Sequence, residues 1–116
     1  MEQMLVNGKD FLRKIRSGEP IENLRLRKGS IRGESLAGLT LRNCTFHTVN
    51  FTEADFSGAL LERCSFHETN LAGANFDKAV LRDCHFQKNP LPGVTLRKTT
   101  FPGSSFEEIA FSQEEL

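Results

Sequence analysis

Tryptophan and tyrosine are absent from this 116-residue chain, whereas phenylalanine occurs ten times. Wet binding surfaces use the polar edges of Trp and Tyr, so we expect the aromatic side chains here to fill an interior. The alternative, stacking of nucleic-acid bases on the rings, is disfavoured because nine of the ten Phe residues fall on one regular series. The aromatic content therefore predicts a core.

An excess of charge of either sign is also missing, because 15 Lys and Arg residues balance 15 Asp and Glu residues. Such a chain has no bulk field to attract nucleic acid or an anionic membrane, so we expect neither as a partner. The ends differ, with eight basic and four acidic residues over 1–32 (net +4) and four Glu over 101–116 (net −4). Ordinary solvated charge is one interpretation. Ends that meet an oppositely charged partner or a second copy are the other.

The sequence has no apolar run long enough for a membrane span and no basic segment followed by an apolar run at its start. Its three cysteines are an odd number in one regular series, unlike a secreted disulfide framework. We therefore expect a cytoplasmic protein.

What the sequence does have is an apolar residue at every fifth position from Ile21 to Leu116. All twenty of these positions, here called lattice positions, are Ile, Leu or Phe. A fixed period is typical of stacked repeats whose single units cannot bury their own apolar face. A longer period of twenty relates two series: Cys44, Cys64 and Cys84, and Phe46, Phe66, Phe86 and Phe106.

Small residues stand two places before the lattice positions, and mostly polar residues stand one place before them. This alternation predicts an extended segment whose lattice and small residues share an inward face. Glycine recurs two places after the lattice position, as at Gly58 and Gly73, where a tight turn needs permissive backbone angles. Each five-residue unit is therefore a short strand plus a corner, and the period of twenty indicates four units per coil.

Stretches such as Ala54-Asp55-Phe56-Ser57-Gly58 closely resemble the pentapeptide-repeat family, whose pattern is A(N/D)LXX. The resemblance covers residues 21–116. It implies an all-β solenoid, a right-handed quadrilateral β-helix, and this length corresponds to about five coils.

The segment before the repeats, Asn7 to Gly18, has the pattern of a short helix, with Asn7 as its cap. Phe11, Leu12 and Ile15 share one face, and basic residues cover the other. A solenoid needs a lid with a polar outer surface at its end, so we expect this helix to cap the stack; a membrane-surface helix is the disfavoured alternative. The predicted organisation is a capping segment over 1–20 and a β-helix over 21–116.

The repeat pattern weakens at Gly29 and Glu34, from Asn89 to Pro92, and at Glu114. We therefore expect a loosely formed first coil, a distorted side near Pro90, and an acidic end that discourages further strand addition. Inside the rod, the lattice side chains and the small residues two places before them should fill the whole cross-section, which leaves no room for a substrate cavity.

The residues that could bind a metal or act in catalysis are not expected to come together at one site. Cys44 and His47, like Cys64 and His67, have a spacing seen in zinc sites, but each Cys should point inward and each His outward. We therefore predict a buried thiol ladder, no metal and no cofactor. No nucleophile is paired with a base and no glycine loop cradles a phosphate, so we expect no enzyme activity.

Two surfaces are candidates for contact with another protein. The first is an outward strip at equivalent positions of successive coils, formed by Thr40, Leu60, Val80 and Thr100. Beside it, Glu22, Arg42, Glu62 and Arg82 should alternate in charge and set the register. The second is the last coil, with Phe106 and Phe111, where related proteins often form homodimers.

The leading hypothesis is a non-enzymatic bacterial interaction module built as a rigid rod. The family resemblance adds two alternatives: a DNA mimic that binds and protects a topoisomerase, and an accessory or effector of a bacterial secretion system. The first is disfavoured because the chain is short and neutral and has no acidic stripe. Nothing in the residues tests the second.

Overall fold

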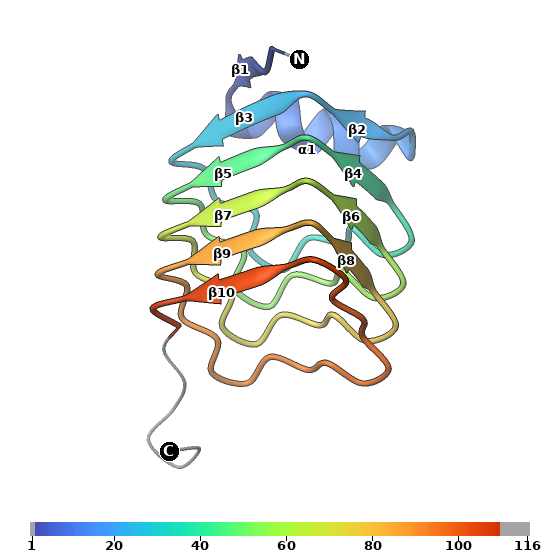
Figure 1. Ribbon diagram of the computed structural model, residues 1–116. Coiled ribbons are helices and arrows are strands. Elements are labelled where there is room, and N and C mark those ends of the chain that lie inside the picture. Colours follow the sequence, from blue (N-terminus) through green and yellow to red (C-terminus); the bar gives the residue numbers. More distant parts are fainter. Residues whose placement is uncertain (1, 110–116) are drawn as a thin grey trace.

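Short parallel strands, stacked twenty residues apart, build the molecule (Figure 1). The computed structural model describes residues 2–109. A six-stranded sheet has the order β1-β3-β5-β7-β9-β10, and a four-stranded sheet has the order β2-β4-β6-β8. The strands of the first sheet are β1 (Met4–Val6), β3 (Leu24–Arg27), β5 (Thr45–His47), β7 (Ser65–His67), β9 (His85–Gln87) and β10 (Ser105–Glu107). Those of the second are β2 (Ile21–Glu22), β4 (Thr40–Arg42), β6 (Leu60–Glu62) and β8 (Val80–Arg82).

The register confirms the period of twenty, because Phe46 pairs with Phe66 and Phe66 with Phe86. The other two sides of each coil are joined by single bridges, such as Asn50 with Asn70. The result is a right-handed, four-sided β-helix of about five coils, as the repeat predicts.

Phenylalanine rings stack along the inside of this helix. The Phe66 and Phe86 rings lie 4.7 Å apart between centroids and are inclined by 1°, and the Phe56 and Phe76 rings lie 4.7 Å apart at 2°. All four side chains are at most 2% exposed, and small buried residues such as Ala54 and Ala74 stand beside them. Large and small side chains thus fill the interior together, at the close packing typical of protein cores.

The helix α1 (Gly8–Ser17) lies across the N-terminal end of the interior (Figure 1). The Asn7 side chain accepts a hydrogen bond from the Asp10 N–H at 2.8 Å, and Gly18 ends the helix in the left-handed conformation that glycine favours. Phe11 is fully buried, with its ring edge-on to those of Phe46 and Phe51 at 5.4 and 6.3 Å. The helix therefore closes this end with an apolar face.

The first coil is well formed, so the prediction of a loose coil is wrong. Ile31 is fully buried, and its N–H donates to the Asn50 carbonyl at 2.7 Å. Both irregular residues meet the lid: a Cβ on Gly29 would lie 3.6 Å from the Gly8 Cα, and Glu34 pairs with Arg16 at 3.7 Å. These departures from the repeat accommodate α1.

The side near Pro90 keeps its ladder, and the prediction of a distorted side is wrong as well. In earlier coils the N–H before the lattice residue donates to the coil above, as from Asn70 to the Val49 carbonyl at 3.1 Å. Pro90 has no N–H, and the buried Asn89 side chain instead donates from Nδ2 to the Thr69 carbonyl at 3.0 Å. One side-chain donor therefore replaces the missing backbone donor.

This replacement predicts energetic coupling between Asn89 and Pro90. Asn89→Val should lower the free energy of unfolding by about 1–3 kcal/mol, because the buried Thr69 carbonyl loses its donor. Adding Pro90→Asn recreates the Val49-Asn50 pair of an earlier coil and should restore most of the loss. Urea denaturation of both single variants and the double variant measures the coupling; simple additivity of the two changes would contradict it.

Candidate functional site

The three cysteines line the corner between the two sheets and are at most 1% exposed. Each thiol donates to a lattice carbonyl one coil above, from Cys64 Sγ to Leu41 O at 3.5 Å and from Cys84 Sγ to Leu61 O at 3.4 Å. On two of the other sides such a carbonyl accepts from the backbone, as Phe51 O does from the Ala54 N–H at 3.0 Å, and on the third Phe46 O accepts from the Thr69 hydroxyl at 3.4 Å. The thiols therefore satisfy backbone carbonyls, which gives the cysteine series a structural role.

We predict that these thiols are unreactive in the folded protein. The pKa of the Cys64 thiol is raised, first by its interaction with the neighbouring thiols of Cys44 and Cys84 and then by burial, whereas the interaction with Cys64 lowers the pKa of Cys44 and of Cys84. Low reactivity of all three therefore follows from their burial, which keeps a reagent away from the sulfur atoms. A disulfide-exchange reagent at pH 8 should label all three only on unfolding, whereas an exposed control thiol introduced by Ser35→Cys should react at once. Fast labelling of the unmodified native protein would contradict this account.

All three histidines gather on the outer face of the six-stranded sheet. The ring centroids of His47 and His67 lie 6.0 Å apart, and those of His67 and His85 lie 5.8 Å apart. The cysteines point to the opposite, inner side of the same coils. Within residues 2–109, no group of three or more His, Cys, Asp or Glu residues is arranged to hold a metal ion. Sequence spacing missed the gathering because His85 precedes its lattice residue while His47 and His67 follow theirs.

The charged ladder on the four-stranded sheet is centred on Glu62. Its carboxylate accepts from Arg42 Nε at 2.8 Å and from Arg82 Nη1 at 3.3 Å. The hydrogen bond from Arg42 is the main cause that lowers the pKa of Glu62. Charges therefore alternate down successive coils, an arrangement that holds the register.

The predicted apolar strip lies on the outer face of the same sheet. Thr40, Leu60 and Val80 occupy paired positions of β4, β6 and β8, and Thr100 bridges to Val80 in the next coil. Leu60 and Val80 are half-buried, and Thr100 is exposed. The structure thus lines up the four residues on one face of the sheet.

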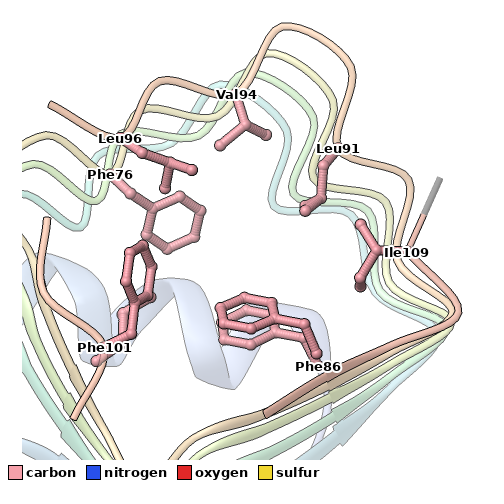
Figure 2. A pocket seen from close by; sticks show the side chains of 9 residues that line it. Phe76, Phe86, Leu91, Val94, Leu96, Phe101 and Ile109 are labelled. Atoms are coloured by element: carbon pink, nitrogen blue, oxygen red, sulfur yellow. The ribbon is translucent and has the colours of Figure 1, made fainter. Parts of the chain in front are cut away.

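An apolar opening lies at the C-terminal end, where the interior is hollow (Figure 2). The hollow measures about 360 Å³ and is lined by nine apolar side chains. Phe86, Leu91, Val94 and Leu96 project into it, and Phe106, which stacks on Phe86 from the next coil, is 43% exposed. The prediction that the fold leaves no cavity is therefore wrong at this end. Phe111, the other residue expected here, lies outside the described residues.

No helix among the described residues is long and apolar enough to cross a membrane.

Residues 35–67 and 59–88 match the family model for pentapeptide repeats, which recognises eight copies. No curated protein matches the chain. Solved structures of similar fold include the following three. The pentapeptide repeat protein Rfr23 from the cyanobacterium Cyanothece has a TM-score of 0.73 at 22% identity, over 78% of this chain and 63% of Rfr23.

HetL, a pentapeptide repeat protein involved in heterocyst differentiation regulation in the cyanobacterium Nostoc, has a TM-score of 0.74 at 23% identity. The match covers 81% of this chain and 40% of HetL. QnrB1, a plasmid-mediated fluoroquinolone resistance protein, has a TM-score of 0.64 at 16% identity, over 82% of this chain and 64% of QnrB1. This chain thus spans less than two thirds of each, and the likenesses concern the fold.

Proposed function

Because the chain is a pentapeptide-repeat protein, we propose that it acts as a non-enzymatic interaction module, a rigid rod that presents its outer faces and its ends to another protein. One observation carries this proposal: the inward side chains fill the coils, while the outer faces carry half-exposed residues in fixed register. A surface of this kind suits recognition of a partner better than conversion of a small substrate.

Two surfaces suit such a partner. The strip of Thr40, Leu60, Val80 and Thr100 supplies aliphatic contact on a flat sheet, flanked by the Arg42–Glu62–Arg82 ladder. The C-terminal coil, with Phe106 exposed, is the site at which a homodimer would form. The free, buried thiols suit a reducing compartment, so we place this activity in the cytoplasm.

Substitution of the strip tests the first surface. Leu60→Glu with Val80→Glu should leave the circular dichroism spectrum unchanged, because both side chains are only half-buried, and should abolish association at this face. The matched control is Ser65→Glu with His85→Glu, which occupies equivalent positions on the other sheet. Light scattering across protein concentration and salt, with affinity capture from a bacterial lysate, measures association. Equal association of both double variants would reject the strip as the contact.

Mimicry of DNA toward a topoisomerase is the weaker alternative. A mimic needs acidic side chains that follow one another along the rod. Here basic and acidic residues alternate around Glu62, and the equivalent row on the other sheet runs from Arg27 through His47 and His67 to Glu107. Neither row supports that function.

A further inference from the structure

The two ends of the same interior differ in what covers them. At the N-terminal end, α1 inserts Phe11 and Ile15, one helical turn apart, which are 0% and 7% exposed. At the C-terminal end, in the described part of the chain, Leu96 and Phe106 are each 43% exposed around the hollow. Figure 2 shows both in one view, with the labelled side chains surrounding the hollow and α1 behind it, across the other end.

The N-terminal end, which α1 covers, shows which kinds of side chain can close an end of the β-helix. Phe11 lies edge-on to Phe46 in the second coil, and Lys9, Arg13, Lys14 and Arg16 keep the outer side of the helix polar. The hollow lies at the other end of the same ladder of Phe rings. Phe106 stacks on Phe86 there, in register with Phe46 and Phe66. An aromatic and an aliphatic side chain one turn apart would fill a hollow of this size.

The charges at the rim of the hollow favour a helix that carries basic residues on the side facing the acidic part of the rim. Glu107 and Glu108 are exposed at the end of β10, and Arg97 and Lys98 are exposed on the side of Leu96. A helix with Lys or Arg on its polar face would therefore meet the acidic side. The N-terminus of such a helix would also be stabilised beside Glu107 and Glu108, and its C-terminus beside Arg97 and Lys98.

We propose that the C-terminal hollow is the docking site for a basic amphipathic helix of a partner protein, which inserts an aromatic and an aliphatic side chain one turn apart, as α1 does at the other end. This inference rests on the proposed function, since it names the kind of partner that the interaction module takes.

The probe is a labelled peptide with the sequence of residues 7–18 of this chain, held helical by a staple between positions 9 and 13 on its polar face. The staple is needed because so short a helix is marginal in water. We expect saturable binding to the full chain by fluorescence anisotropy. Replacing Phe11 and Ile15 of the peptide with alanine should weaken binding at least about tenfold, as for central anchors of an interface. Glu107→Lys with Glu108→Lys in the protein should weaken it by a smaller factor that shrinks as salt is raised.

Protein variants locate the binding site. Leu96→Glu places a charge at the mouth of the hollow, at a residue exposed enough to leave folding intact, and should abolish binding. Leu60→Glu on the sheet face is the matched control and should bind as the unmodified chain does. Absence of binding, or binding that survives Leu96→Glu, would overturn the proposal.

Binding that appears only after residues 110–116 are removed would overturn it too, because the chain's own end would then be the occupant. A solution dimer that Leu96→Glu disrupts, with no binding of the peptide, would make a second copy the occupant. Loss of association in the Leu60/Val80 variant with no binding of the peptide would reject this inference and leave the interaction function standing.

Discussion

Replacing Phe66 with alanine is expected to lower the free energy of unfolding by about 3–5 kcal/mol, because the change leaves a cavity in the middle of the stack. Phe66 is fully buried, and its ring contacts those of Phe46 at 5.0 Å and Phe86 at 4.7 Å. The coils above and below are fixed by backbone ladders, so they cannot collapse into the space. Urea denaturation followed by circular dichroism measures the loss.

The matched control for this variant is Phe106→Ala, which removes the same ring from the same ladder at its open end. Phe106 is 43% exposed and contacts the Phe86 ring from one side only, at 4.8 Å. We expect a loss of about 1 kcal/mol, in proportion to the smaller apolar area that it buries. Equal losses for Phe66→Ala and Phe106→Ala would contradict the assignment of an open end to the last coil.

The second large effect is expected for Phe11→Ala, which opens the lid. Phe11 is the one aromatic residue of α1, is fully buried, and meets the rings of Phe46 and Phe51. Its loss should lower the free energy of unfolding by about 3–5 kcal/mol and uncover the first full coil. Guanidinium denaturation measures the stability, and light scattering detects the association that an uncovered apolar end should cause.

Leu12→Ala, at a partly buried position of the same helix, is the control for Phe11→Ala and should cost far less. Alanine has the higher helix propensity in both cases, and the gain is larger for Phe11→Ala, so a larger loss of stability in that variant reports the contact of the ring with the coil. If the two changes cost the same, α1 is not anchored through Phe11, and the comparison between the two ends of the rod loses its basis.

Much of the fold could be predicted because the repeat constrains it redundantly. A slip of one residue in any strand would bring lattice side chains such as Phe46 and Phe66 to the outside, so the period of five fixes which face is inward. The period of twenty fixes which residues stack, and the burial of Cys44, Cys64 and Cys84 follows from both.

What could not be predicted lies where the repeat stops or is compensated. Strand β1 (Met4–Val6) has only three residues, two of them exposed, and it exists because β3 offers it a free edge. To predict that the Asn89 side chain replaces the missing N–H of Pro90, one must know that the Thr69 carbonyl lies within reach of Asn89 Nδ2. The repeat specifies the contacts between neighbouring coils. It therefore gives no information about the end of the last described coil, where the contact with a further coil is missing from the described residues.

Candidate interfaces were predictable only as rows of residues. The alignment of Leu60 with Val80 follows from the period, whereas the hollow depends on how far Leu91, Val94 and Leu96 reach into the end of the interior. Those distances are set by side-chain packing, which the pattern of the sequence does not encode.

The open C-terminal end is the proposed docking site of the partner. Methyl-labelled nuclear magnetic resonance spectra of the full chain, recorded with and without the stapled helical peptide, show whether the peptide binds there. We expect the methyl signals of Leu91, Val94, Leu96 and Ile109 to shift and those of Leu60 and Val80 to stay in place. Shifts confined to Leu60 and Val80, or no shifts at all, would contradict this proposal.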